Sequence, residues 1–155
     1  MLTSRVHYRL PYTTTLALEL AAAYVADAPE LVWQRSASEA LAAIRRSVVE
    51  NNRYEVSVWD GDKIVGVAIA VPDDDDHVGV CLSVQWRFVL PEYRGLAGIK
   101  LQRAIMHLAS RLQFGIIAYT KRTGDAKYEL RYMRVRNPHG QESKEDHQKG
   151  GPVHR

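Results

Sequence analysis

The spacing of hydrophobic residues predicts a short strand and then a helix at the start of the chain. Residues 4–10 form the predicted strand, which Pro11 ends. Hydrophobic side chains then recur every three to four positions, at Leu16, Leu20, Ala23 and Tyr24. The hydroxyl groups of residues 13–15 are suited to cap this helix at its N-terminus, and Pro29 closes it.

A second helical pattern begins at Ser36. Glu39 follows three positions later, so the two residues form a capping box in which each side chain accepts a hydrogen bond from the other's backbone N–H. One hydrophobic stripe follows, at Leu41, Ile44, Val48 and Val49. This helix is predicted to end at residues 51–52, which are both asparagine.

The hydrophobic period then changes from helical spacing to strict alternation. Every second residue is apolar at Tyr54, Val56 and Val58. This alternation predicts a strand with one buried face. Asp60 and Gly61 predict a tight hairpin turn, because both residue types tolerate a positive φ. The partner strand, residues 63–71, has β-branched side chains on one face and small ones on the other, so a helix or a ligand can approach the small face closely.

The next strand is predicted to be the longest and to lie in the middle of the sheet. Pro72 and the aspartates at residues 73–76 form an exposed loop before it. Seven hydrophobic residues then alternate strictly within residues 77–90, at Val78, Val80, Leu82, Val84, Trp86, Phe88 and Leu90. A strand of this kind is central to a sheet. Pro91 ends it.

A third helix and two further strands complete the predicted domain. The helix carries its hydrophobic residues on one face, at Leu101, Ala104, Ile105, Leu108 and Leu112. Residues 114–120 and 127–135 form strands, joined by a turn at residues 123–125.

The predicted order is therefore β-α-α-β-β-β-α-β-β, an α+β fold with a mixed sheet. It occupies residues 1–136 as a single domain. Residues 137–155 form a polar C-terminal tail, which cannot bury enough apolar surface to order itself.

The composition is that of an ordinary globular protein. Of the 155 residues, 46% are hydrophobic and 25% are charged, and no apolar run approaches the roughly 18 residues that a membrane span needs. The first residues do not follow the pattern of a signal peptide. The single cysteine, Cys81, excludes an intramolecular disulfide and a cysteine-based zinc site, and no metal is predicted. We therefore expect a cytoplasmic protein with no membrane partner.

The net charge of +3 is modest, but its distribution is uneven. Basic residues gather in a stretch near the C-terminal end of the domain, at Lys121, Arg122, Lys127, Arg131, Arg134 and Arg136. Such a stretch can attract the phosphate groups of a nucleotide cofactor or of nucleic acid. The alternative is a solvated strand face.

The segment from Phe88 to Leu101 has the pattern of a strand, a glycine-containing loop and a helix. Backbone amides at the N-terminus of such a helix have no intrahelical acceptor, and the helix dipole adds partial positive charge. Both properties suit the loop to a pyrophosphate group. A glycine-containing loop before a helix can also be a plain turn.

Within this segment, Val89-Leu90-Pro91-Glu92-Tyr93-Arg94-Gly95 resembles the V-x-P-E-Y-R-G lead into motif A of the GNAT (N-acetyltransferase) superfamily. The predicted order of elements over residues 1–136 also matches. The resemblance implies a GNAT-like acyl-CoA N-acyltransferase fold. It also implies that amides of the loop grip the pyrophosphate of acetyl-CoA, and that the strand backbone pairs with the pantetheine arm. The implied cofactor-binding residues are Arg87, Val89, Arg94, Gly95, Leu96, Ala97, Gly98 and Ile99.

Two positions depart from the pattern of the family. Ala97 stands where glycine is usual, and Ile99 stands where glycine or alanine allows close approach of the backbone. A loop that is one residue shorter would instead put Gly98 in the last position. The sequence leaves both alignments open.

The resemblance also implies a general base and a general acid. The base is often a glutamate on the long strand, but no carboxylate occurs at the positions that alternate with its hydrophobic residues: His77, Gly79, Cys81, Ser83, Gln85 and Arg87. His77 is the candidate base there, and the alternative for it is a solvated strand end. The acid is usually a tyrosine on a helix after the fifth strand. This chain leaves little room for that helix, so Tyr119 is the candidate acid, with Tyr128 and Tyr132 as candidates by residue type only.

Three functions follow as hypotheses. The first is transfer of an acetyl group from acetyl-CoA to an amine. The second is a catalytically silent GNAT-fold structural or assembly protein, because the chain resembles truncated GNAT-like proteins of tailed bacteriophages, some of which are virion components. In that case, neighbouring chains would contact residues 137–155 and the protein would reside in the virion. The third is nucleic-acid binding through residues 121–136, which no base-stacking pattern or known module supports.

Overall fold

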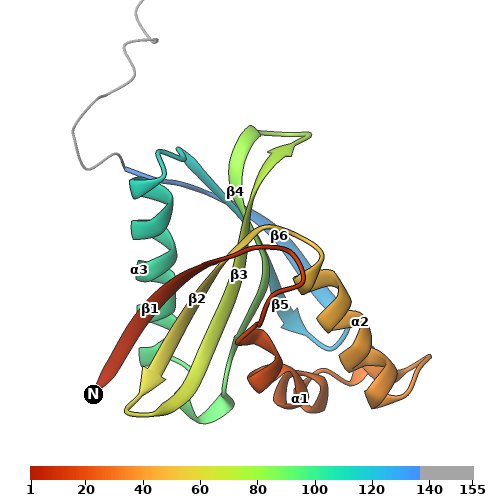
Figure 1. The fold of residues 1–155 in the computed structure, drawn as a ribbon. Helices are drawn as coiled ribbons and strands as arrows, with labels where there is room; N and C mark the ends of the chain where they lie inside the picture. The colour runs from red at the N-terminus through yellow and green to blue at the C-terminus, as the bar shows by residue number, and fades with distance from the viewer. Residues whose placement is uncertain (137–155) are drawn as a thin grey trace, which may run out of the picture.

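The computed structural model describes residues 1–136 and confirms the predicted order of helices and strands (Figure 1). The elements are β1 (Leu2–Arg9), α1 (Ala17–Asp27), the short 3-10 helix η1 (Pro29–Val32), α2 (Ala37–Val49), β2 (Arg53–Asp60), β3 (Lys63–Asp75), β4 (Gly79–Val89), the 3-10 helix η2 (Pro91–Tyr93), α3 (Leu96–Arg111), β5 (Ile116–Gly124) and β6 (Lys127–Arg134). No helix among these residues is long and apolar enough to cross a membrane.

The six strands form one sheet in which spatial order follows sequence order. All neighbouring strands are antiparallel except β4 and β5, which are parallel because α3 crosses over between them. The helix α3 packs on one face of the sheet, and α1 and α2 pack on the other (Figure 1). Each face therefore has its own hydrophobic cluster. The small residues of β3, Ala68 and Ala70, belong to the α3 cluster, as the close approach of a helix requires.

The N-termini of α1 and α2 are capped in different ways. Ser36 and Glu39 form the predicted capping box at the start of α2. At α1 the N-cap is Leu16, whose side chain cannot cap, rather than one of residues 13–15. Thr15 still contributes, because its hydroxyl oxygen accepts a hydrogen bond from the N–H of Ala17 at 3.2 Å.

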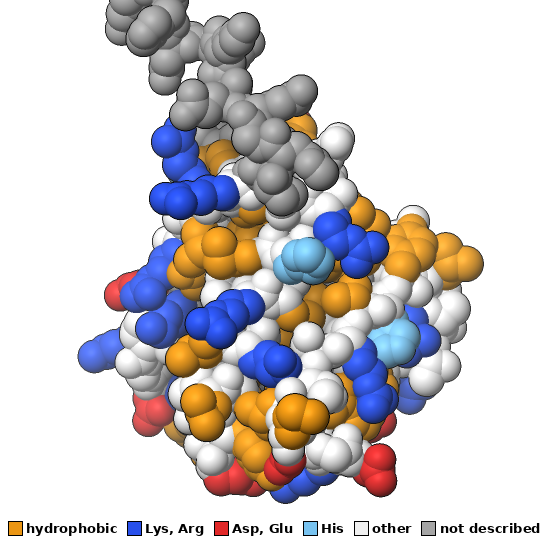
Figure 2. Space-filling view, turned by 90° about the vertical axis from the view of Figure 1, so that its left-hand side faces the viewer, with side chains coloured by type: hydrophobic (Ala, Val, Ile, Leu, Met, Phe, Trp, Pro, Cys, Tyr) orange, Lys and Arg blue, Asp and Glu red, His pale blue; other side chains and the backbone are white. Residues whose placement is uncertain are grey.

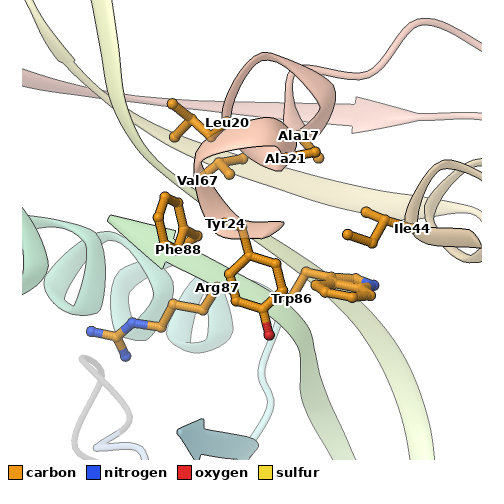
Figure 3. A pocket seen from close by; sticks show the side chains of 9 residues that line it. All are labelled: Ala17, Leu20, Ala21, Tyr24, Ile44, Val67, Trp86, Arg87 and Phe88. Atoms are coloured by element: carbon orange, nitrogen blue, oxygen red, sulfur yellow. The ribbon is translucent and has the colours of Figure 1, made fainter. Parts of the chain in front are cut away.

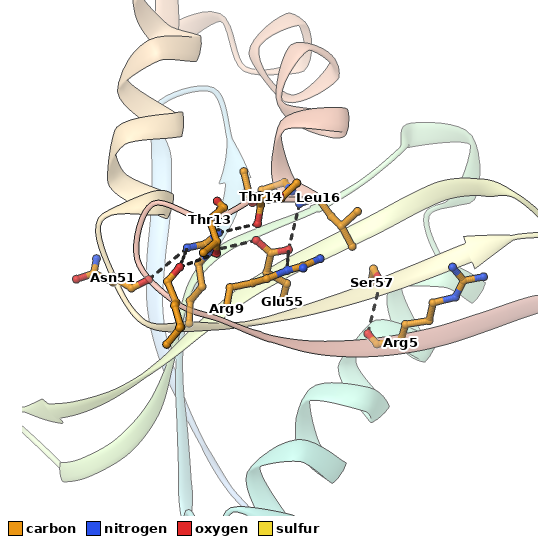
Figure 4. Close-up of polar contacts among 12 residues, drawn as sticks. Arg5, Arg9, Thr13, Thr14, Leu16, Asn51, Glu55 and Ser57 are labelled. Atoms are coloured by element: carbon orange, nitrogen blue, oxygen red, sulfur yellow. Dashed lines mark hydrogen bonds and ion pairs between the residues drawn. The ribbon is translucent and has the colours of Figure 1, made fainter.

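The strand β2 is buried on both faces, which corrects the prediction of one buried face. Glu55 and Ser57 are fully buried, although the alternation assigned them to the solvent side. The reason is a buried ion pair: the Nε of Arg53 lies 3.0 Å from a carboxylate oxygen of Glu55. Figure 4 shows Glu55 below the start of α1, with the hydrogen bond that it accepts from the amide of Leu16. Burial opposes ionisation of Glu55, but hydrogen bonds from the Thr15 hydroxyl, the Leu16 amide and Arg53 outweigh it and hold the pKa of Glu55 below its usual value.

The loop between β1 and α1 is tied to this pair. The two terminal nitrogens of Arg53 donate to four backbone carbonyl oxygens, those of Leu10, Asn51, Thr13 and Thr14. With the bond from Nε to Glu55, all five N–H donors of the guanidinium are used. This side chain therefore holds the entrance of α1 against β2.

Most of the aspartate run is exposed as predicted, but residues 73–75 extend β3 instead of forming a loop, and only Asp76 lies in the turn. The strand β3 continues to Asp75, and residues 73–75 pair with residues 79–81 of β4. The antiparallel neighbour supplies the backbone hydrogen bonds, so the charged side chains can project from the strand. Asp75 closes the turn by accepting hydrogen bonds from the N–H groups of His77 and Val78. His77 therefore belongs to this turn, and β4 begins two residues after it.

A β-bulge in β4 divides the predicted hydrophobic face into two. Trp86 pairs with Ile69 and Val84 pairs with Ala70, so Gln85 is an extra residue in the register. An extra residue turns every following side chain to the opposite face. Leu82 and Val84 accordingly pack toward α3, whereas Phe88 and Trp86 pack toward α1 and α2.

The positive charge of the described residues is not confined to the stretch at residues 121–136. The helix α3 contains no acidic residue, and Arg103, His107 and Arg111 are exposed on it. Figure 2 shows the side that carries α3 and the beginning of β1, where Lys and Arg share the surface with hydrophobic side chains and most Asp and Glu lie along the lower edge. The surface of this domain is therefore basic on more than one side.

Candidate functional site

A cleft opens where β4 and β5 separate. These strands pair at only three positions, from Leu82 with Ile117 to Val84 with Tyr119, and the bulge at Gln85 follows immediately. Beyond this point lies a cleft of about 600 Å³. Residues of five elements and of the loop before α3 line it: Tyr24 and Asp27 of α1, Arg87, Phe88 and Val89 of β4, Arg94 and Gly95 of the loop, Gly98 and Gln102 of α3, Tyr119, Thr120, Lys121 and Arg122 of β5, and Arg131 and Met133 of β6.

The N-terminus of α3 enters this cleft without a cap. The N-cap residue is Gly95, with a φ of 101°, and no side chain caps the helix. Such a φ favours glycine. The first N–H to find an acceptor within the helix is that of Ile99, which donates to the carbonyl of Gly95 at 2.9 Å. The amides of residues 96–98 precede it, so they have no intrahelical acceptor.

The structure brings only some of the predicted loop residues to the cleft. Arg94, Gly95 and Gly98 line it. Ala97 is fully buried in the core, and Ile99 and Leu96 are directed to solvent, with 52% and 78% of their surface exposed. Gly98, and not Ile99, is therefore the small residue against the cleft. A Cβ atom built on Gly98 would meet no other atom within 4 Å, so its backbone is open to a ligand.

The edge of β4 that faces the cleft has free backbone groups. The N–H of Leu90 donates to the carbonyl of Val65 on β3 at 2.9 Å. Hydrogen-bonding direction alternates along an antiparallel strand, so the N–H and C=O groups of Arg87 and Val89 point away from β3 and toward the cleft. Pairing with β5 ends at Val84, which leaves this edge available to an extended ligand.

Arg87 places a positive charge beside the first turn of α3. Its guanidinium donates to the carbonyl of Gly98 at 3.3 Å and to the side-chain oxygen of Gln102. Burial lowers the pKa of Arg87, because a low-dielectric environment disfavours the charged form. An arginine remains protonated near neutral pH even so.

Two other arginines of the cleft are held by carboxylates of the segment from α1 to η1. Arg94 lies 2.6 Å from a carboxylate oxygen of Asp27, the last residue of α1. Arg122 forms a two-pronged pair with Glu30 of η1, at 2.6 and 3.0 Å. The hydrogen bond from Arg122 is the main cause that lowers the pKa of Glu30 to about 2. These pairs anchor the end of α1 to the loop before α3, and η1 to β5.

The basic stretch at residues 121–136 contributes to the cleft. Lys121, Arg122 and Arg131 line it. Arg122 also pairs with Glu30 of η1, to which Tyr128 donates at 2.7 Å. These three basic residues therefore place positive charge on the wall of the cleft that β5 and β6 form.

The candidate catalytic residues lie apart: Tyr119 lies beside the middle of β4, and His77 lies in the turn before it. Tyr119 lines the cleft, and its pairing with Val84 places it where the two strands begin to separate. It also lies beside Arg131, whose pKa is raised by the carboxylate of Glu129 and, to a smaller extent, by Tyr119. His77 lies in the β3–β4 turn with Asp75 and Tyr132. Five strand residues separate Gly79, the start of β4, from Val84, the partner of Tyr119, or about 17 Å. His77 is not among the residues that line the cleft, so His77 and Tyr119 do not share one site.

The remaining nucleophilic or acidic candidates are few. Cys81 is fully buried, and burial raises the pKa of its thiol, so it is not an activated nucleophile. No helix separates β5 from β6, as the sequence predicts. Among the described residues that line the cleft, Asp27 is the only carboxylate, and it is paired with Arg94.

Several residues of the cleft carry no signal in the sequence. Tyr24 and Asp27 come from α1, Gln102 comes from α3, and Met133 comes from β6. Tyr24 belongs to the predicted hydrophobic stripe of its helix, so its position at the cleft could not be separated from a role in the core. Asp27 has no partner nearby in the sequence, because Arg94 is 67 positions away.

No protein-family model and no curated protein matches this sequence. Solved structures do match. They include the ribosomal-protein-S18-alanine N-acetyltransferase of Escherichia coli, with 14% identity, a TM-score of 0.52, and coverage of 80% of this chain and 70% of that one. The chain has the GNAT fold.

Two further GNAT-fold neighbours have similar scores. A putative acetyltransferase of the GNAT family from Desulfovibrio desulfuricans has 12% identity and a TM-score of 0.51, over 77% of this chain and 73% of that one. AAC(6')-Iy, solved in complex with the bisubstrate analogue CoA-S-monomethyl-acetylneamine, has 14% identity and a TM-score of 0.50, over 80% and 83% of the two chains. At this level of identity the likeness establishes the fold, which confirms the predicted fold class.

Proposed function

We propose that this GNAT-fold protein binds acetyl-CoA, or a closely related acyl-CoA, in the cleft between β4 and β5 and transfers the acyl group to an amine. The observation that carries the proposal is the uncapped start of α3 beside the free edge of β4. Free amides, a helix dipole and a strand edge together match a ligand that has a diphosphate followed by an extended amide-containing arm. The CoA analogue bound to AAC(6')-Iy supports this class of ligand for the fold.

The residues present fit such a ligand. The amides of residues 96–98 and the guanidinium of Arg94 would hold the diphosphate, because they offer N–H donors and positive charge at one place. Gly98 leaves room for a phosphate against the backbone, since nothing fills the position of its missing Cβ. The backbone groups of Arg87 and Val89 would pair with the amides of the pantetheine arm. When bound, acyl-CoA supplies the activated thioester.

We assign to Tyr119 the transfer of a proton to the departing thiolate. Tyr119 lines the cleft where β4 and β5 begin to separate, and it carries a hydroxyl group that can donate. The described lining of the cleft offers no unpaired carboxylate as a base. We therefore assign removal of the amine's proton to water, so that the acceptor amine reacts in its neutral form.

Isothermal titration calorimetry with CoA and acetyl-CoA tests the proposal. Binding in the micromolar range is expected, and Gly98→Leu should weaken it at least tenfold, because the new side chain enters the cleft. Gly115→Leu is the matched control, since Gly115 also has open space at the position of its Cβ but does not line the cleft. Absence of binding at millimolar CoA would refute the proposal.

The competing hypothesis is a catalytically silent assembly protein of a bacteriophage virion. It predicts that CoA does not bind. Its contact segment, residues 137–155, lies outside the described residues. The same titration therefore separates the two functions without any knowledge of the acceptor substrate.

A further inference from the structure

A small apolar pocket lies beside the cleft, on the face of the sheet that α1 and α2 cover. Its volume is about 20 Å³. Figure 3 shows Tyr24 between Phe88 and Trp86, with Val67, Leu20 and Ile44 around them. Ala17 and Ala21, one turn apart on α1, leave the space open because their side chains are short. A cavity needs about 10–15 Å³ to hold one water-sized group, so this pocket admits one or two carbon atoms.

The walls of the pocket are aromatic and fixed in place. The ring of Tyr24 packs edge-on against Trp86 and Phe88, with centroid separations of 5.5 and 5.3 Å. The indole N–H of Trp86 donates to the hydroxyl oxygen of Ser47 at 3.2 Å, which satisfies this polar atom. The pocket therefore offers almost no hydrogen-bond acceptor to a charged amine, whereas an aliphatic group would be well accommodated.

The pocket adjoins the proposed coenzyme site through β4. Tyr24, Arg87 and Phe88 line both the pocket and the cleft. The bulge at Gln85 sets this arrangement, since it turns Trp86 and Phe88 to the pocket side. Arg87, between them, extends away from Tyr24 (Figure 3) and reaches Gly98 on α3. A ligand bound along the free edge of β4 would therefore have the pocket on one side and Tyr119 on the other where it reaches the bulge.

We propose that this pocket receives the aliphatic end of the acyl group and restricts it to two or three carbon atoms. The assignment rests on the proposed function. It follows from the apolar lining, which suits an alkyl group and disfavours the acceptor amine, and from the volume, which excludes longer chains. Trp86, Ile44 and Tyr24 are then the residues that set acyl-chain length.

Calorimetric titration of the protein with CoA, acetyl-CoA, propionyl-CoA, butyryl-CoA and hexanoyl-CoA tests this assignment without requiring turnover. Each carbon atom that enters the pocket should tighten binding by up to about fourfold relative to CoA. The gain should stop at propionyl, and hexanoyl-CoA should bind no more tightly than CoA itself.

Two substitutions make the test specific. Ile44→Val removes one methyl group from the wall and should move the affinity maximum toward butyryl-CoA. Ala21→Val fills the space and should reduce acetyl-CoA and propionyl-CoA to the affinity of CoA. Ile105→Val is the control, because Ile105 is also buried but belongs to α3, which packs on the other face of the sheet.

The outcomes separate this assignment from the proposed function. If CoA binds and the affinity profile over chain length is the same in the wild type and both pocket variants, the pocket does not hold the acyl group. If CoA itself does not bind, the proposed function fails and this assignment fails with it. A change of affinity for CoA alone, equal for every acyl chain, would also contradict the assignment, because it would reflect a disturbance of the cleft.

Discussion

The carboxylate of Asp27 lies 2.6 Å from the guanidinium of Arg94, and this pair joins the end of α1 to the loop before α3. Arg94 is one of the residues that we propose for the diphosphate, so a ligand anion and Asp27 compete for the same positive charge. Asp27→Asn should therefore tighten the binding of CoA about three- to tenfold, since a partly exposed charge contact is worth about 1 kcal/mol. Calorimetry at low and high salt measures this effect.

The control for this prediction is Asp76→Asn. It makes the same change of charge in the exposed β3–β4 turn, at the opposite end of β4. Weaker binding of CoA to the Asp27 variant than to the wild type would show that Asp27 positions Arg94 rather than competing with the ligand.

The pair of Glu30 and Arg122 should make the stability of the domain depend on acid pH. Its hydrogen bond lowers the pKa of Glu30 from 4.5 to about 2. A lowered carboxyl pKa stabilises the fold fully above the unfolded value, and this contribution is lost as pH falls from about 4.5 toward about 2. Glu30→Gln should lower the free energy of unfolding by about 1 to 2 kcal/mol at pH 7.

Urea unfolding of the wild type and the Glu30→Gln variant at several pH values measures this contribution. The difference between the two proteins should shrink below pH 4.5 and be lost below about pH 2. A difference that is constant over this range would exclude the ion pair as its cause.

Arg53→Lys should be among the most destabilising single substitutions in this chain. The guanidinium uses five donors inside the protein, whereas an ammonium group has three, so buried carbonyl oxygens and Glu55 would lose partners. We expect a loss of about 3 to 5 kcal/mol in the free energy of unfolding, measured with urea. Arg9→Lys is the comparison: Arg9 contacts the same carboxylate at 3.4 Å from a partly exposed position, and should cost less than about 1 kcal/mol.

Tyr119→Phe tests the proposed proton donor. Removal of the hydroxyl should reduce kcat by about a hundredfold or more, because a positioned general acid contributes about 10² to 10⁴ in rate. The dissociation constant of CoA should change less than about twofold, since the backbone and the ring remain. Tyr132→Phe removes a hydroxyl that instead bonds Asp75, away from the cleft, and should retain full activity. An unchanged kcat in the Tyr119 variant would assign the proton transfer to another group.

The order of helices and strands could be predicted because each element keeps one period over its length. The capping box at Ser36 and the turn at Gly61 are local signals that need no tertiary contact. The errors arise where a specific ion pair or a neighbouring strand, and not the hydrophobic period, decides the outcome. Glu55 is buried because Arg53 neutralises it, and the aspartates before Asp75 extend β3 because β4 lies beside them.

The bulge at Gln85 shows a different limit of the sequence pattern. Strict alternation from Val78 to Leu90 predicts one continuous face, but a single extra residue in the register reverses the face halfway along the strand. No residue type marks this position. The consequence is large, because the bulge decides that Trp86 lies over the apolar pocket while Arg87 reaches the start of α3.

The sequence indicates the candidate site along the continuous segment around Arg94 and Gly98, through the resemblance to motif A, and at Tyr119. Other residues of the cleft are distant in the chain, such as Tyr24 and Asp27 of α1. Asp27 and its partner Arg94 are 67 positions apart. A pair at such a separation leaves no periodic signal, so reasoning from one sequence misses the wall that α1 forms.

Only three residue pairs join β4 to β5 by backbone pairing. Side chains supply further contacts between the β5–β6 hairpin and the rest of the domain, such as Arg122 with Glu30 and Tyr132 with Asp75. A ligand that contacts both β4 and β5 in the cleft would therefore join the two parts of the sheet where backbone hydrogen bonds between them are missing.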